Sequence, residues 1–343
     1  MPHSHHSHSG QFCRHAKDTL EQVIVEAIRQ QFKVFGLSEH APRYRLQDLF
    51  PEESDLQPAD LEEAYLAFLQ EAIRLRSIYS AQISLLIGLE TDYITPLDLE
   101  RTTALLEKQP EIDYVVGSVH HVNGVSIDFD RPTWVRAVRT VVDRKEASTM
   151  TVSPGSQTVS LPLVDDPEST PSMTDLRAFL LAYFDAQYDM LQTHQPEVIG
   201  HIDLCLLWTP EIRLGDTRLE GVWDKVVRNV EYGISYGALF EANAAAIRKG
   251  WKTSYPNPDI LELILSRNGR ICLSDDSHGV SYVGLNYPKM RDYLVAQGVE
   301  DVFYLVPSSA SSDDDPPVGK RGRVKARRLQ RWAEDAFWSK KDS

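Results

Sequence analysis

The sequence predicts a single α/β domain whose core is a parallel barrel. Amphipathic helical stretches alternate with short apolar runs along most of the 343 residues, and this repeated β-then-α order is typical of parallel sheets. Histidine or an acidic residue also ends one apolar run after another, at the edge where parallel barrels collect their chemistry. Length alone allows one large domain or two ordinary ones, so the alternation decides the prediction.

The elements follow in order along the chain. Apolar side chains recur at helical spacing in residues 17–32, 59–82, 97–108, 134–142, 174–193, 221–232, 256–267 and 288–296. Runs of strand length lie between them at residues 34–37, 83–90, 114–121, 197–203, 237–243, 270–278 and 302–306. The barrel is therefore expected to span residues 1–306.

Two segments fall outside this alternation. Residues 143–172 are rich in Ser, Thr, Pro and charge, which predicts a surface insertion. Residues 307–343 change from acidic to basic, and we expect a disordered tail with a possible short C-terminal helix.

Composition excludes several classes of protein. No stretch approaches the ~20 consecutive apolar residues of a transmembrane helix, and the N-terminus lacks the pattern of a secretory signal. Cys13, Cys205 and Cys272 form no CxxC pair, which favours a reducing, cytoplasmic compartment. The net charge of −14 argues against nucleic acid as a partner. We therefore expect a small-molecule substrate, with neither nucleic acid nor membrane as partner.

Nine side chains at the strand ends are candidate metal ligands. They are His6, His8, His15, His40, Glu90, His120, His201, Asp276 and His278. In a parallel barrel these positions converge on the C-terminal face, and imidazole with carboxylate suits Zn, Mn or Fe. A His-x-His pair holds both rings on one side of an extended segment.

The opening stretch, MPHSHHSHSG, has three interpretations: an affinity tag, a metal-scavenging tail or the first strand of a metal site. A lone histidine is more often structural than a ligand. The recurrence of His, Glu or Asp at strand after strand favours the metal site, because independent structural roles would not produce it.

The order of these motifs resembles the PHP (polymerase and histidinol phosphatase) superfamily. HSHHSHSG, SEHAPR, GLETDY, GSVHHVNG and EANAAAIRKG…YPNP are most similar to its histidinol-phosphate phosphatase branch, and the first two to the fungal enzymes. The likeness runs from residue 3 to about 306. It implies a distorted (β/α)7 barrel with three metal ions.

The resemblance also implies roles for the ligands. The first metal would be held by His6, His8, Glu90 and Asp276. Glu90 and His120 would bridge to or bind the second, with His15 as its further ligand, and His40, His201 and His278 would complete the set. A frame that uses His3 and His5 stays open, and His121 and Asp275 duplicate their neighbours.

These residues predict a metal-dependent phosphomonoesterase. Clustered cations lower the pKa of bound water and clamp phosphoryl oxygens, so a hydroxide held by Glu90, His120 and Asp276 would attack phosphorus. Arg43 and Arg248 follow two strands closely enough to bind phosphate through their planar forks. The resemblance implies L-histidinol phosphate as the substrate, in histidine biosynthesis. Asp92, Asp128 or Asp130 could meet the substrate ammonium.

Three other functions remain open at this stage. A phosphoesterase of the same superfamily could act on another small phosphate ester. A metal-dependent deaminase of the amidohydrolase type also uses His-x-His, although nine ligands and two arginines count against it. A barrel that has lost turnover would be a metal-binding or regulatory protein.

Overall fold

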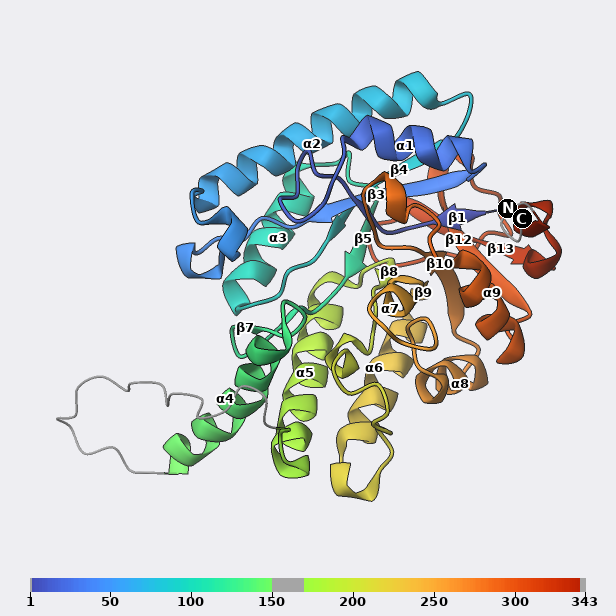
Figure 1. The fold of residues 1–343 in the computed structure, drawn as a ribbon. Coiled ribbons are helices and arrows are strands. Elements are labelled where there is room, and N and C mark those ends of the chain that lie inside the picture. Colours follow the sequence, from blue (N-terminus) through green and yellow to red (C-terminus); the bar gives the residue numbers. More distant parts are fainter. Residues whose placement is uncertain (1, 150–169, 340–343) are drawn as a thin grey trace.

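The computed structural model describes residues 2–149 and 170–339 of the protein. Seven parallel strands form its central sheet (Figure 1). Their order is β1-β3-β4-β5-β8-β9-β10, and each neighbouring pair is parallel. The strands are β1 His3–Ser4, β3 Val34–His40, β4 Ser84–Glu90, β5 Tyr114–Gly117, β8 Val198–Ile199, β9 Leu239–Asn243 and β10 Arg270–Ser274.

A short second pairing brings the two edges of this sheet together. β11 (Ser277–His278) runs parallel to β2 (Ser7–His8), so the last strand of the barrel lies beside the first. The backbone N–H of Leu273 donates to His3 Nε2 at 3.0 Å across the same seam. The sheet is thereby nearly closed, and the predicted seven-stranded parallel α/β barrel is confirmed.

Helices surround the sheet (Figure 1). They are α1 Leu20–Arg29, α2 Pro58–Tyr79, α3 Pro96–Lys108, α4 Arg131–Thr149, α5 Met173–His194, α6 Val222–Ser235, α7 Ala245–Arg248, α8 Pro258–Ser266 and α9 Tyr287–Ala296. α1 shows why they form where they do. Thr19 and Gln22 close a reciprocal capping box at its start, and Leu20, Val23, Ile24 and Ala27 make the buried stripe that holds it on the barrel.

The C-terminal segment corrects the sequence prediction. Residues expected to be disordered after 306 instead form β13 (Val324–Gln330), antiparallel to β12 (Asp301–Pro307), and end in α10 (Ala336–Ser339). The basic charge of the segment hides a strand pattern: Val324 and Ala326 are buried, whereas Lys325 and Arg327, which alternate with them, are partly exposed, and Arg327 pairs with Asp315. The alternation of buried and partly exposed side chains, rather than the net charge of the segment, indicates the strand.

The predicted insertion at 143–172 lies largely outside the described residues. α4 continues past 142, where the sequence ended it, to Thr149, and Ser172 caps α5 through the backbone N–H of Asp175. Residues 150–169 lie between these two helices and are not described.

The two ends of the barrel differ in chemistry. At the N-terminal end, side chains such as Val34, Leu86 and Leu239 form an apolar cluster that the β12–β13 hairpin covers with Leu305 and Val324. The C-terminal end collects the charged and imidazole side chains. The hairpin thus seals one end and leaves the other for ligands.

Candidate metal centre

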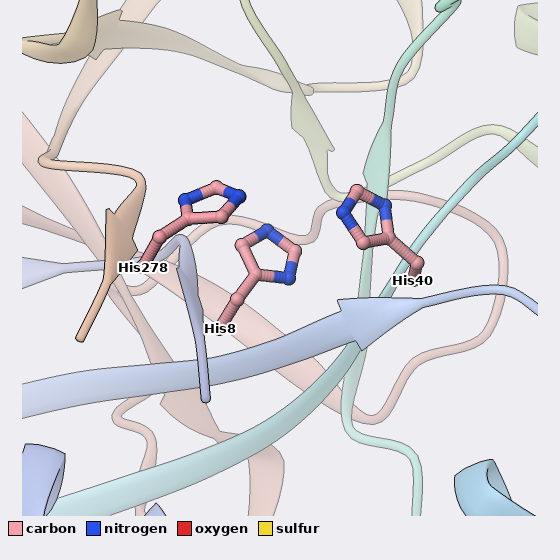
Figure 2. Close-up of side chains that lie close together, drawn as sticks. All are labelled: His8, His40 and His278. Atoms are coloured by element: carbon pink, nitrogen blue, oxygen red, sulfur yellow. The ribbon is translucent and has the colours of Figure 1, made fainter. Parts of the chain in front are cut away.

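The nine predicted ligands meet at the C-terminal end of the barrel. Their ligand atoms form overlapping triplets in which all atoms lie within 4.8 Å of one another, and Figure 2 shows one of them. The triplets are His6–His8–Glu90, His6–His201–Asp276, Glu90–His120–His201, His8–His40–His278 and Cys13–His15–His40. Cys13 is the one member of these groups that the sequence had not proposed.

Glu90, the last residue of β4, stands at the middle of the cluster. Its Oε1 lies 3.1 Å from His6 Nε2, 3.3 Å from His120 Nε2 and 3.2 Å from His201 Nε2. Its Oε2 lies 3.3 Å from His8 Nε2 and 3.1 Å from His40 Nδ1. Burial alone would raise the pKa of Glu90, but the surrounding imidazoles, His6 first, hold it well below its usual value.

The donor set fits bound cations. Buried atoms of the cluster without a hydrogen-bond partner, among the described residues, include His6 Nε2, His8 Nε2, His40 Nε2 and Glu90 Oε1. Buried polar atoms are normally paired, and here several face one another around a shared space. Imidazole nitrogens and carboxylate oxygens at such separations are a ligand set for Zn, Mn or Fe.

Asp276, between β10 and β11, and His15, in the loop after β2, complete the ring of ligands. Asp276 Oδ1 lies 3.6 Å from both His6 Nε2 and His8 Nε2, and the backbone of Asp276 is left-handed, with a φ of 47°. His15 sits at the rim, about one-third exposed, with its ring 5.2 Å from that of His278.

The structure distinguishes the two possible His-x-His frames. His6 and His8 point into the cluster, whereas His3 and His5 point toward the opposite end of the barrel. His5 Nε2 accepts a hydrogen bond from the backbone N–H of Leu305 at 3.0 Å, as His3 does from Leu273. Neither belongs to a ligand triplet within the described chain.

The duplicate residues also find other partners. His121 Nδ1 lies 3.5 Å from Asp92 and its ring stacks on Phe50. Asp275 accepts a hydrogen bond from Ser4 Oγ at 2.8 Å.

Three carboxylates lie behind the ligands: Glu39 and Glu241, which the sequence prediction did not include, and Asp92, which it had proposed for the substrate ammonium. Glu241 Oε1 lies 2.7 Å from His6 Nδ1, Glu39 Oε2 lies 3.4 Å from His8 Nδ1, and Asp92 Oδ1 lies 3.4 Å from His120 Nδ1. A carboxylate on the far nitrogen fixes the tautomer and orientation of a ligating imidazole. Burial lowers the pKa of His8, but the adjacent carboxylates of Glu39 and Glu90 raise it to about 9. Acidic residues inside apolar strand runs were the signal that could have revealed Glu39 and Glu241.

Arg43 does not stand where the sequence predicted. Its guanidinium is buried, with Nη1 3.0 Å from Asp92 Oδ2 and Nη2 bonded to Glu53. Phe50 covers it at 4.2 Å from the ring centre. Two buried carboxylates therefore occupy the donors that were expected to bind phosphate, and Arg43 instead holds Asp92 behind His120.

Arg248 does face the cluster. It follows β9 on the short helix α7, lies over the ring of Tyr282 at 4.4 Å, and donates to the carbonyl of Asp276 at 3.3 Å. Together with seven of the nine ligands it lines a cavity of about 400 Å³, a size that suits a small substrate. Asp128 and Phe129 line the same cavity, whereas Asp130 accepts from the backbone N–H of Thr133 at the start of α4.

None of the helices in the described parts of the chain combines the length and the apolar character that crossing a membrane requires.

The comparisons with known proteins agree with the predicted family. A model of the PHP domain matches residues 4–245. The chain belongs to the PHP family. Its motif order had predicted this membership, which is confirmed.

Relatives of this PHP protein cover nearly its whole length. It is 42% identical over 306 residues to the "Probable histidinol-phosphatase" of Schizosaccharomyces pombe. This match covers 89% of this chain and 90% of that protein. It is 30% identical to the histidinol-phosphatase of Saccharomyces cerevisiae over 98% and 99% of the two chains.

A solved structure shares the fold. Histidinol phosphate phosphatase from Lactococcus lactis, complexed with zinc, L-histidinol and phosphate, superposes with a TM-score of 0.56 at 18% identity. The match covers 87% of this chain and 94% of that one.

Proposed function

We propose that this protein hydrolyses L-histidinol phosphate to L-histidinol and phosphate, with about three divalent metal ions (Zn, Mn or Fe) held by the nine ligands. The reaction belongs to histidine biosynthesis. The observation that carries the proposal is Glu90, a buried carboxylate with five imidazole nitrogens within 3.3 Å, on the floor of a cavity that Arg248 lines. The relatives named for this activity cover nearly all of the chain.

Bound divalent ions would supply a nucleophile at neutral pH by lowering the pKa of water and would neutralise the phosphoryl oxygens. Glu90, His120 and Asp276 are the ligands proposed around the reacting position. His6 and His8 lie beneath them, and His15, His40, His201 and His278 complete the set. Glu241, Glu39 and Asp92 keep the imidazoles oriented from behind.

The cavity walls are proposed to bind the substrate. Arg248 is half-buried beside Asp276 and presents a planar fork, which suits two phosphate oxygens. Asp128 is the best placed of the three candidate carboxylates for the substrate ammonium. Asp130 caps α4, and the Oδ2 of Asp92 is bonded to Arg43.

A substrate panel tests the proposal. Metal-loaded protein would be assayed with histidinol phosphate, other small phosphomonoesters, and amide or amidine substrates. We expect the highest kcat/KM for histidinol phosphate and no release of ammonia. A higher kcat/KM for another phosphate ester would keep the phosphoesterase and replace the substrate. Deamination without phosphate release would overturn the proposal.

A further inference from the structure

Cys13 lies beside the proposed metal centre without a role in it. Its side chain is buried, and Sγ lies 3.4 Å from His15 Nδ1 and 3.2 Å from His15 Nε2. The sulfur also forms a triplet with His15 and His40 in which the ligand atoms are within 4.8 Å. Cys205 and Cys272, by contrast, are fully buried in the apolar clusters of the barrel.

The loop that carries Cys13 is fixed by its own hydrogen bonds. The backbone N–H of Cys13 donates to the carbonyl of Ser9 at 2.9 Å, and the carbonyl of Cys13 accepts from Ala16 at 3.1 Å. Ser9 is tied to Glu39 through its backbone N–H at 2.8 Å and its hydroxyl at 2.9 Å. The thiol is therefore held toward the ligands by the loop between His8 and His15.

A second observation points to a ligand at this place. Cys13, His15 and His40 line a small cavity of about 30 Å³, large enough for one water or one ion. Glu39 lines it as well and is more than nine-tenths buried, and its Oε2, which lies 3.4 Å from His8 Nδ1, has no hydrogen-bond partner in the described structure. A buried carboxylate oxygen without a hydrogen bond, on a residue beside a space of this size, suits a cation there.

We propose that Cys13 is a further metal ligand, which makes the His15–His40 corner of the centre a mixed sulfur–nitrogen position that prefers zinc to manganese. The inference rests on the metal centre of the proposed function but not on its substrate. Around a tetrahedral zinc ion, with Zn–S about 2.3 Å and Zn–N about 2.0 Å, sulfur and nitrogen ligands stand roughly 3.5 Å apart. The observed separations from His15 are close to that distance. Thiolate is a soft ligand, which zinc accepts and manganese disfavours.

Cobalt substitution tests the assignment without any assay of activity. Cobalt bound by a thiolate has a sulfur-to-metal charge-transfer band in the near ultraviolet, and cobalt bound by imidazole and carboxylate alone has none. We expect the band in the cobalt-loaded wild-type protein. It should persist in the Cys205→Ser/Cys272→Ser double variant, whose one remaining cysteine is Cys13, and vanish in Cys13→Ser.

The double variant keeps the test decisive if Cys13→Ser fails to fold. Wild-type protein that contains cobalt by elemental analysis but lacks the band would overturn the inference. So would a band that Cys13→Ser retains. If cobalt-loaded protein hydrolyses histidinol phosphate but lacks the band, the inference about Cys13 is wrong and the proposed function stands. A band in protein without that activity overturns the substrate alone, and protein that binds no cobalt overturns both.

Metal competition gives a second readout. With zinc and manganese offered together, the ratio of bound zinc to bound manganese should fall in Cys13→Ser by on the order of tenfold, the lower end of what metal-site substitutions cost. An unchanged ratio would contradict the preference.

Discussion

Four histidines within six residues of the chain divide between the two ends of the barrel. His3 and His5 point toward the apolar end, where each accepts a backbone N–H. His6 and His8 point toward the polar end, where each meets Glu90 and Asp276. The division follows position along the segment, because His3 lies in β1, where the segment enters the sheet, and His8 lies farther on in β2, paired with His278 at the polar end.

The surroundings give these rings opposite acid–base behaviour. Burial, and then the neighbouring His3, lower the pKa of His5 well below its usual value. Burial acts in the same direction on His6, but the charges of Glu90, Asp276 and Glu241 raise its pKa well above the usual value. Position in the barrel, rather than residue type, therefore separates a structural histidine from a candidate ligand.

The largest expected effect comes from substituting one histidine of each kind. His6→Ala should abolish turnover and lower the amount of bound metal. The loss of activity should exceed the roughly 10- to 100-fold loss that is typical when a residue behind a metal ligand is substituted. His3→Ala should keep the metal and leave kcat nearly unchanged, while the free energy of unfolding falls by about 1–3 kcal/mol because the N–H of Leu273 loses its acceptor. Kinetics, elemental analysis and urea unfolding of both variants check this. A severe loss of metal in His3→Ala would show that the other frame is used.

Removing the metal should change the structure and activity of the polar end of the barrel only. Chelation should abolish phosphatase activity, and zinc or manganese should restore it, with about three ions per chain in the active protein. The helical circular dichroism should persist in the chelated protein, because the apolar end and the helices need no cation. Active protein with a single ion would contradict the trinuclear proposal.

The two arginines allow a similar comparison. Arg248→Ala should lower kcat/KM about 10- to 100-fold by removing a charge-assisted contact worth about 1.5–3 kcal/mol, with metal content unchanged. Arg248→Lys should recover part of the loss, since it keeps the charge without the fork. Arg218→Ala, which removes an exposed arginine paired with Asp216, is the matched control. Wild-type kinetics in Arg248→Ala would remove this residue from the phosphate site.

Substituting Arg43 should lower stability, because its guanidinium is buried between two carboxylates. Arg43→Ala leaves Asp92 and Glu53 buried without their cation, which should cost about 3–5 kcal/mol of unfolding free energy. The variant should lose kcat through misorientation of His120, with KM for the phosphate ester little changed. Thermal unfolding and steady-state kinetics measure both effects. A large rise in KM without loss of stability would restore Arg43 to the substrate site.

The smallest effect is a pH dependence of stability. Burial, with the charges of Lys320 and Arg321, lowers the pKa of His194 to about 4. Between pH 6.5 and 4 the unfolded chain binds a proton at this residue and the folded chain does not, so its contribution is present above pH 6.5 and is lost as the pH falls. The loss is at most about 3 kcal/mol. Urea unfolding at pH 7 and pH 4.5 should show a smaller decrease in His194→Gln than in the wild type. Equal decreases would contradict the assignment.

The sequence predicted the barrel and the convergence of its strand ends because both depend on local patterns. A parallel sheet brings the ends of strands such as those at Glu90 and His201 together whatever lies between them. The role of Arg43 could not be predicted in the same way. Glu53 comes from a short 3-10 helix and Asp92 from the loop after β4, and their pairing with Arg43 is a property of the folded chain. The strand at Val324 was missed because alternation was hidden under a basic composition.

The closure of the barrel has a consequence for how the protein is made. Ser4 bonds to Asp275, 271 residues later, and His5 bonds to Leu305, 300 residues later. At about 5–20 residues per second, a ribosome adds the partners of the first strand on the order of 15–60 s after that strand. During this interval His6 and His8 are without Asp276 and His278, so the pocket for the metal is incomplete. Metal can enter the finished geometry only after nearly the whole barrel has left the ribosome.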